Sequence, residues 1–200
     1  MVEKFSFEDL FVLDLSNNHQ GILSHGQEIV RAVGQVVQEH GVRAALKFQF
    51  RDIDTFVHPA HRKQSDNKHV PRFLSTRLTP EELEQLAHDV RQAGMITMST
   101  PFDENSVDLI ERLDLNVIKI ASCSVDDWPL IERVSEVDKP VIFSTGGAGL
   151  SDIDNLVSFF EHRKVHFALM HCVAIYPSPP ETLQLNQIDL LRQRYPDHVI

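Results

Sequence analysis

Six short apolar runs that resemble β-strands recur along the chain, and a segment with helical periodicity follows each of them. The runs occupy residues 11–15, 44–50, 96–99, 117–122, 141–145 and 167–173. Strands that are apolar on both faces, and that alternate with helices, are typical of a parallel sheet covered by helices on its faces. The sequence therefore predicts an α/β protein with a parallel sheet.

Two of the intervening segments carry strong helix signals. In residues 22–37 the apolar side chains recur with the 3.6-residue spacing of a helix, and Gly41 stands where a C-cap is expected. In residues 79–94, Thr79 and Glu82 match the capping box of a helix N-terminus. Shorter helices are predicted at residues 104–113, 127–136, 151–162 and 186–195.

Polar side chains close every one of the six apolar runs. In chain order these side chains are Asp14, Lys47 with Gln49, Ser99 with Thr100, Lys119 with Ser122, Ser144 with Thr145, and His171 with Tyr176. An open doubly wound sheet binds ligands only near its switch point, whereas a (β/α)₈ TIM-type barrel directs all its strand ends at one site. The glycine-rich stretch at 144–149 also lacks the dinucleotide-binding spacing. The pattern therefore favours the barrel.

The number of strand–helix units is too small for a complete barrel. About six units use up the chain, residues 198–200 read as the start of a seventh strand, and a full barrel needs about 250 residues. We therefore expect residues 1–200 to be the N-terminal portion of a longer barrel, or to need a partner segment that closes it. Residues 51–77 are rich in His, Asp and Lys and predict a long polar connection that serves as a lid or an oligomer contact.

Two lysines stand inside apolar strands of an acidic protein. A buried lysine requires a partner or an anion that offsets its desolvation, so Lys47 and Lys119 together indicate a dianionic ligand. The alternative is a pair of salt bridges, such as one between Lys47 and Asp14. Gln49 lies two residues beyond Lys47 and points the same way. Residues 144–146 present hydroxyl and backbone N–H groups of the kind that bind phosphate.

Charge and composition narrow the function classes. Nineteen Lys and Arg against 29 Asp and Glu give a net charge of −10, so we expect no binding to nucleic acid or to anionic membranes. The absence of a long apolar segment and of signal-peptide features predicts a cytoplasmic protein.

Cys123 and Cys172 form no CxxC pair and are interpreted as small buried apolar side chains. His19 and His171 fit either metal or proton chemistry or a structural role.

Six motifs together carry a family resemblance. They are LDLSNNHQG at 13–21, LKFQF at 46–50, STPFDENSVDLI at 99–110, IKIASCSVDDWPLI at 118–131, KPVIFSTGGAG at 139–149 and MHCVAIYPSPPETLQLNQI at 170–188. In order and spacing they resemble the sialic acid synthase (N-acetylneuraminate synthase) family across nearly the whole chain. The resemblance implies a (β/α)₈ barrel transferase that condenses phosphoenolpyruvate with an N-acetylated hexosamine, such as N-acetylmannosamine. The products would be a nonulosonic acid and phosphate.

The resemblance also implies site residues and partners. The implied catalytic residues are Asp14, Lys47 and Lys119, and the implied substrate-binding residues are Gln49, Thr100, Ser122, Ser144 and Tyr176. A divalent metal (Mn or Mg) is expected to polarise the sugar aldehyde, and its His ligands are expected beyond Ile200. The full-length protein is expected to be a homodimer with a C-terminal antifreeze-like domain outside residues 1–200.

Three positions depart from the family pattern. Asp14 and Ser124 stand where the family has Glu, and Ala174 stands where it has Asn. These changes predict a variant hexosamine as the substrate. One alternative is a degenerate barrel that binds a sugar or a partner without catalysis, and another is a different phosphoenolpyruvate-dependent sugar aldolase. The 200-residue portion alone is expected to be inactive.

Overall fold

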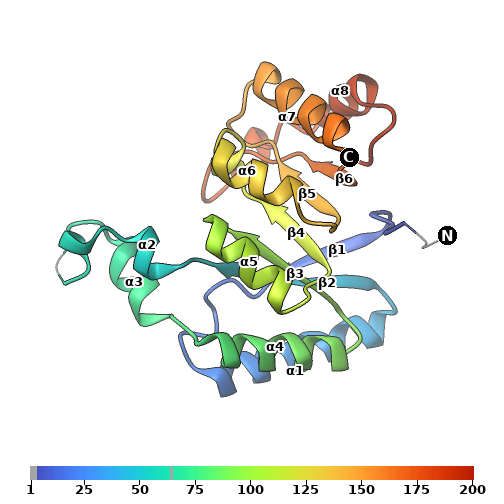
Figure 1. Ribbon diagram of the computed structural model, residues 1–200. Helices are drawn as coiled ribbons and strands as arrows, with labels where there is room; N and C mark the ends of the chain where they lie inside the picture. The colour runs from blue at the N-terminus through green and yellow to red at the C-terminus, as the bar shows by residue number, and fades with distance from the viewer. Residues whose placement is uncertain (1–3, 64) are drawn as a thin grey trace. The chain divides into compact units, whose positions relative to one another are not determined.

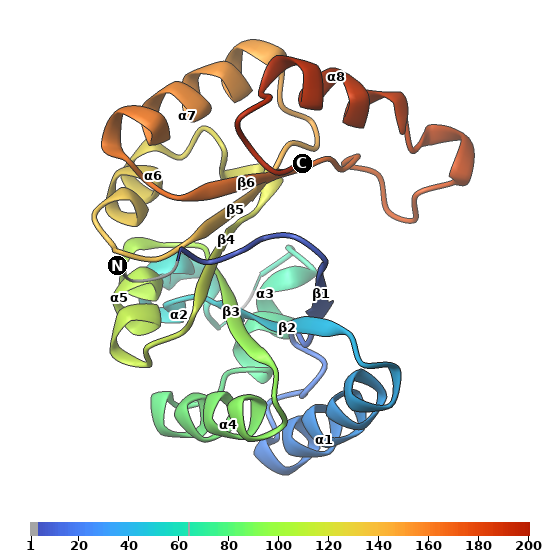
Figure 2. The same cartoon turned by 90° about the vertical axis from the view of Figure 1, so that its right-hand side faces the viewer.

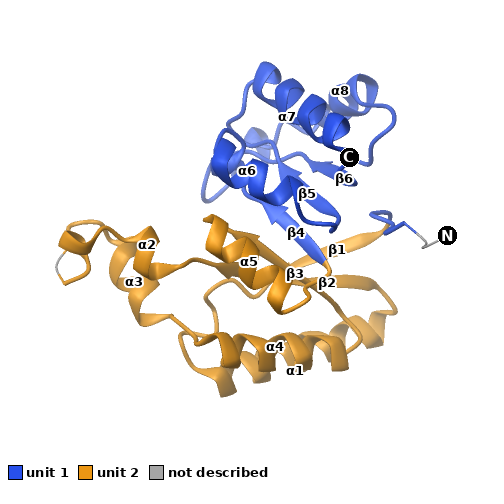
Figure 3. Cartoon of the chain, viewed as in Figure 1, with its two compact units in different colours: residues 1–8, 117–200 blue, residues 9–116 orange. Residues whose placement is uncertain are grey.

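The computed structural model describes residues 4–63 and 65–200, which fall into two compact units (Figure 3). Unit 1 comprises residues 1–8 and 117–200, and unit 2 comprises residues 9–116. Each unit contains three parallel strands with helices packed beside them (Figure 1). The predicted α/β architecture with six parallel strands is therefore confirmed, whereas closure into a complete (β/α)₈ barrel remains a prediction.

In unit 2 the three strands lie in chain order. β1 (Leu10–Asp14) pairs with β2 (Arg43–Phe50), and β2 pairs with β3 (Ile96–Pro101). Helices α1 (Leu23–His40) and α4 (Pro80–Gln92) pack against each other (Figure 2), and α5 (Glu104–Arg112) follows β3. A Cβ atom added at Gly34 of α1 would lie 2.8 Å from the Cβ of Ala93, so this glycine allows the two helices to approach closely.

The helix signals in unit 2 are confirmed. The Thr79 side chain accepts a hydrogen bond from the Glu82 N–H (3.2 Å), and the Glu82 carboxylate accepts one from the Thr79 N–H (2.8 Å). This pair is the predicted capping box of α4. Gly41 caps the end of α1 with a φ of 60°, a conformation that glycine adopts without steric cost.

The predicted polar connection at 51–77 contains short helices that the sequence did not indicate. They are α2 (Ile53–Phe56), the 3₁₀ helix η1 (Pro59–His61) and α3 (His69–Ser75). Asp52 caps α2, and the Arg51 guanidinium lies 3.8 Å from the Phe102 ring centroid and 4.4 Å from that of Phe73. Local caps and cation–π contacts of this kind order a polar segment without any helical periodicity. Gln64 lies outside the described residues.

Unit 1 repeats the parallel arrangement. β4 (Val117–Ile120) precedes β5 (Val141–Ser144), and β5 pairs with β6 (Phe167–Met170). Its helices are η2 (Ser122–Ser124), α6 (Trp128–Ser135), α7 (Leu150–Arg163), η3 (Pro180–Thr182) and α8 (Asn186–Arg194). The rings of Phe143, Phe160 and Phe167 pack with centroids 5.6 to 6.2 Å apart and form the centre of this core.

Polar contacts attach the last helix of unit 1 to α7. Arg194 donates two hydrogen bonds to the Asp154 carboxylate (2.7 and 2.6 Å), and the Tyr195 hydroxyl donates a third (2.7 Å). The guanidinium of Arg194 lowers the pKa of Asp154 to about 2, and burial raises the pKa of Tyr195 to about 12.

The last three residues lie beside β6 but are not assigned to a strand. The start of a seventh strand at residues 198–200 therefore stays a prediction. The Val199 carbonyl nevertheless accepts a hydrogen bond from the Leu169 N–H of β6 (2.9 Å), which places this segment beside the strand. A single bond of this kind does not fix extended geometry over three residues.

No helix among the described residues is long and apolar enough to span a bilayer.

Candidate active site

At the carboxyl end of β1 and β2 in unit 2, a lysine and an aspartate form an ion pair. The Lys47 Nζ lies 2.8 Å from the Asp14 Oδ1. The Lys47 side chain is 10% exposed, whereas the Asp14 side chain is 57% exposed. The alternative prediction of an ion pair between these two residues is therefore confirmed. Because the carboxylate remains exposed, water and solutes reach one side of this pair.

Gln49 and Thr100 lie on the same face of the strands as this ion pair. In the strand register Asp14 is opposite Lys47, and Gln49 is opposite Thr100. The Gln49 Oε1 accepts a hydrogen bond from Arg51 (3.2 Å), and Thr100 is buried. Unit 2 therefore brings together the four of its residues that the sequence predicted for the site.

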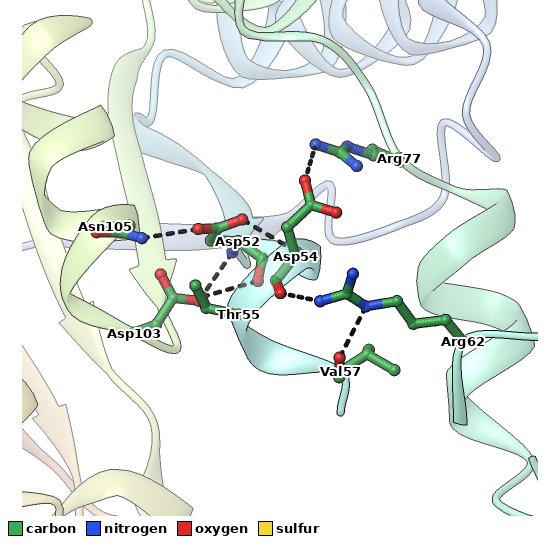
Figure 4. Close-up of polar contacts among 8 residues, drawn as sticks. All are labelled: Asp52, Asp54, Thr55, Val57, Arg62, Arg77, Asp103 and Asn105. Atoms are coloured by element: carbon green, nitrogen blue, oxygen red, sulfur yellow. Dashed lines mark hydrogen bonds and ion pairs between the residues drawn. The ribbon is translucent and has the colours of Figure 1, made fainter. Parts of the chain in front are cut away.

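Gln49 also lines a cavity of about 450 Å³ within unit 2. Polar side chains on the walls of this cavity include those of Asn17, His19, Asp52 and Asn105. Figure 4 shows the contact in which the Asn105 amide donates to the Asp52 carboxylate (2.7 Å), and this bond lowers the pKa of Asp52. The cavity therefore presents an ionised carboxylate and neutral amides next to Gln49.

His19 has a structural role. Its Nδ1 accepts a hydrogen bond from the Gly21 N–H (3.1 Å), and the side chain is buried. Burial lowers the pKa of His19, so the ring is neutral at pH 7. Gly21 has a φ of 73°, and an added Cβ would lie 2.6 Å from the Ser75 carbonyl oxygen, so this turn requires glycine.

In unit 1 the ends of β4 and β5 bring a lysine and two serines together. Lys119 is 5% exposed, and its ammonium donates hydrogen bonds to the Ser144 hydroxyl and to the Ile120 carbonyl (2.9 Å). The Ser122 hydroxyl oxygen accepts a hydrogen bond from the Gly146 N–H (3.1 Å). A buried ammonium and two hydroxyls have the donor chemistry that binds carboxylate and phosphate oxygens.

Two further residues of interest, His171 and Tyr176, follow β6 in the chain. Tyr176, the other implied substrate-binding residue, is 95% exposed. The His171 Nε2 lies 2.9 Å from the Leu183 carbonyl oxygen, so the structural interpretation of this histidine holds. The structure therefore supports Lys119, Ser122 and Ser144 as neighbours and leaves Tyr176 in solvent.

Sequence reasoning missed the role of one cysteine. The Cys172 Sγ lies 3.0 Å from the Ser122 Oγ, and a Cβ added at Gly146 would lie 2.7 Å from that sulfur. Cys123, in contrast, is exposed, so the interpretation of both cysteines as buried apolar side chains is wrong. The position of Cys172 in the sequence could have indicated this contact. Cys172 follows the end of β6, just as Ser122 follows the end of β4 and Gly146 follows the end of β5.

No group of three His, Cys, Asp or Glu side chains in residues 4–63 and 65–200 is arranged to hold a metal ion. The described residues therefore do not provide a complete divalent metal site. Asp14 is the one implied catalytic residue with an oxygen ligand for a hard cation, and its partner is Lys47. The predicted Mn or Mg remains a prediction for the whole protein.

Comparison with known proteins places the chain in a family. The NeuB family profile matches residues 35–199. The spore coat polysaccharide biosynthesis protein SpsE of Bacillus subtilis is 32% identical over 92% of this chain and 49% of its own length. The N-acetylneuraminate-9-phosphate synthase of Drosophila melanogaster is 24% identical over 94% of this chain and 52% of its own length.

A solved structure gives the same result. A crystal structure from Chromobacterium violaceum, assigned as spore coat polysaccharide biosynthesis protein E, is 44% identical with a TM-score of 0.92, covering 96% of this chain and 57% of that one. The chain thus spans about half the length of the relatives it matches. The resemblance drawn from the six sequence motifs is confirmed, and the chain belongs to the NeuB family.

Proposed function

We propose that the whole protein containing this chain condenses phosphoenolpyruvate with an N-acetylated hexosamine, yielding a nonulosonic acid and phosphate. The observation that carries the proposal is the buried Lys119 ammonium, which is held by the Ser144 hydroxyl, with the Ser122 hydroxyl just beyond the end of the same strand β4. Membership of the NeuB family and the name of the Drosophila relative support the same reaction.

The charge of phosphoenolpyruvate suits a buried lysine. A lysine with 5% exposure loses most of its hydration, and an anionic ligand offsets that loss. Phosphoenolpyruvate carries a carboxylate and a phosphate, and each of them accepts hydrogen bonds from ammonium, hydroxyl and N–H donors. In this proposal Lys47 and Thr100 bind the same ligand, and the Lys47 ammonium interacts with it while remaining paired with Asp14.

The proposed reaction forms one carbon–carbon bond and breaks one carbon–oxygen bond. C3 of phosphoenolpyruvate bonds to the aldehyde carbon of the open-chain sugar, and the aldehyde oxygen takes up a proton. Water then adds at the cationic C2 and loses one proton. As the bond between C2 and the phosphate oxygen breaks, the hydroxyl left on C2 loses the second proton and becomes the keto oxygen, and the departing phosphate takes up a proton. The products are inorganic phosphate and a 2-keto acid.

The residues of this chain are proposed to stabilise charge and to move one proton. Lys47 and Lys119 would neutralise the phosphate that leaves, which is electrostatic stabilisation by fixed donors. The exposed Asp14 carboxylate would accept the proton that the attacking water loses. A divalent metal, Mn or Mg, would supply Lewis-acid chemistry at the sugar aldehyde in the whole protein, where His side chains outside residues 1–200 are proposed to hold it.

The hexosamine itself is proposed to be a variant of N-acetylmannosamine. Gln49 is proposed to contact the sugar, because its amide lines the cavity of unit 2 and has both a donor and an acceptor. Ser124 is buried and Ala174 is exposed, and both replace longer polar side chains of the family pattern. Tyr176 is proposed to reach the sugar only when substrate is present.

We also propose that the whole protein is a homodimer in the cytoplasm.

Phosphate release by the whole protein tests the proposal. Phosphoenolpyruvate is mixed with each member of a panel of N-acetylated hexosamines, and the phosphate formed is measured. We expect release that requires both substrates and that falls in Lys119→Met at phosphoenolpyruvate concentrations near the Kd. Absence of release with every sugar, in a folded protein that binds phosphoenolpyruvate, would contradict the proposal and favour a non-catalytic sugar-binding barrel.

A further inference from the structure

Three residues from different strand ends meet around the Ser122 hydroxyl in unit 1. Ser122 follows β4, Gly146 follows β5 and Cys172 follows β6. The Ser122 Oγ accepts a hydrogen bond from the Gly146 N–H (3.1 Å) and lies 3.0 Å from the Cys172 Sγ. A third bond between neighbouring strand ends, from the Thr145 N–H to the Met170 carbonyl (3.1 Å), keeps β5 and β6 together at this point.

A serine hydroxyl has one proton and two acceptor lone pairs. The Gly146 N–H occupies one lone pair of Ser122, so the direction of the hydroxyl proton depends on its contact with Cys172. If the Cys172 thiol donates, the serine proton is free to point at a ligand. If the serine donates to sulfur, that proton is used. An anion accepts hydrogen bonds but cannot donate them, so an anionic ligand selects the first arrangement.

We propose that Cys172 is a positioning residue for substrate, an inference that rests on the function proposed above. Its thiol donates to the Ser122 hydroxyl, and the Ser122 proton then points at an oxygen of the bound phosphoenolpyruvate. Gly146 fits the same arrangement, because a Cβ at this position would lie 2.7 Å from the Cys172 Sγ and 3.1 Å from the Ser122 Oγ. Any larger residue would displace the sulfur from the serine.

The packing around the thiol predicts its chemical reactivity. Cys172 is half-buried, so we expect a small alkylating reagent to reach its sulfur. An alkyl group on this sulfur would lie against Ser122. A ligand bound to Ser122 and an alkyl group on Cys172 therefore exclude each other. Cys123 lies next to Ser122 in the sequence but is exposed, which makes it a matched control within the same chain.

Alkylation of the whole protein by iodoacetamide, read by mass spectrometry of the two cysteine peptides, tests the inference. With phosphoenolpyruvate at about ten times its Kd, alkylation of Cys172 is expected to slow about tenfold. Alkylation of Cys123 is expected to proceed at an unchanged rate. Equal rates at Cys172 with and without phosphoenolpyruvate would overturn the inference.

Substitutions supply a second readout. Loss of one weak hydrogen bond in Cys172→Ala is expected to raise the KM for phosphoenolpyruvate about two- to tenfold with little change in kcat. Cys172→Ser restores a donor and is expected to recover most of the loss, whereas Cys123→Ala has no effect. An alanine variant with wild-type KM, or a serine variant no better than alanine, would overturn the positioning role.

The two readouts separate failure of the inference from failure of the proposed function. Protection of Cys172 by phosphoenolpyruvate without phosphate release from any hexosamine would retain the positioning role and reject the condensation. Phosphate release without protection of Cys172 would retain the condensation and reject the positioning role.

Discussion

Replacement of Lys119 by methionine separates substrate binding from folding. The Lys119 ammonium is buried at the end of β4, where it donates to the Ser144 hydroxyl and to the Ile120 carbonyl (2.9 Å). Methionine has a similar length and no charge, so Lys119→Met keeps the length of the side chain and removes the ammonium with its hydrogen bonds. If Lys119 is there to bind an anion, this change lowers the affinity for phosphoenolpyruvate more than it lowers the free energy of unfolding.

The size of the effect follows from the burial of the ammonium. A hydrogen bond to a charged group contributes about 1.5 to 3 kcal/mol, so the Kd for phosphoenolpyruvate is expected to rise about 10- to 150-fold. In the protein without substrate, the change removes the desolvation cost of a buried ammonium but leaves the Ser144 hydroxyl and the Ile120 carbonyl without this donor. The two effects oppose each other, so the free energy of unfolding is expected to change by less than about 2 kcal/mol.

Isothermal titration calorimetry with phosphoenolpyruvate and urea denaturation of the same samples measure the two quantities. Lys139→Met is a suitable control, because Lys139 lies just before the amino end of β5, at the opposite end of the strand from Ser144. This substitution is expected to leave the affinity for phosphoenolpyruvate unchanged. An unchanged Kd in Lys119→Met, together with a loss of about 2 kcal/mol or more in stability, would refute the reasoning. Lys119 would then be a structural residue.

Three other substitutions test the packing, pH dependence and capping described above. Gly146→Ala places a Cβ 2.7 Å from the Cys172 Sγ, so the free energy of unfolding should fall by about 1 to 3 kcal/mol. Adding Cys172→Ala should restore part of this loss, and a double variant whose loss equals the sum of the two single losses would contradict the packing argument. Asp154→Asn tests pH dependence: the pKa of Asp154 falls from 3.8 to about 2 on folding, so the carboxylate stabilises the protein above pH 4. This contribution, about 1 kcal/mol or less after solvent screening, is lost as the pH falls towards 2, and a variant with the same acid unfolding curve as wild type would contradict it. Thr79→Ala removes the capping box of α4 and should lower the free energy of unfolding by about 1 kcal/mol, whereas Thr79→Ser should retain most of it.

The helices and strands were predictable from local signals. The capping box at Thr79 and the glycine C-cap at Gly41 are encoded within a few residues, and the apolar runs identify all six strands to within a few positions. The short helices of residues 51–77 were not predictable. Their arrangement depends on contacts between distant residues, such as that of Arg51 with Phe102, which follows β3. Cation–π contacts between distant residues leave no periodic signal in the sequence.

The charged residues of the candidate site could be predicted from the sequence, but the contacts among its residues could not. A lysine inside an apolar strand stands out, so Lys47 and Lys119 were identified, and so was the pairing of Lys47 with Asp14 as one alternative. The contact of Cys172 with Ser122 joins residues 50 positions apart, and no spacing rule relates them. The exposure of Tyr176 also depends on the path of the chain after β6.

A crystal structure of the whole protein with phosphoenolpyruvate bound would test the central claim most directly. We expect oxygens of this ligand within hydrogen-bond distance, about 3 Å, of both the Lys47 Nζ and the Lys119 Nζ. A phosphoenolpyruvate molecule that contacts only one of these ammonium groups, or neither of them, would contradict the account.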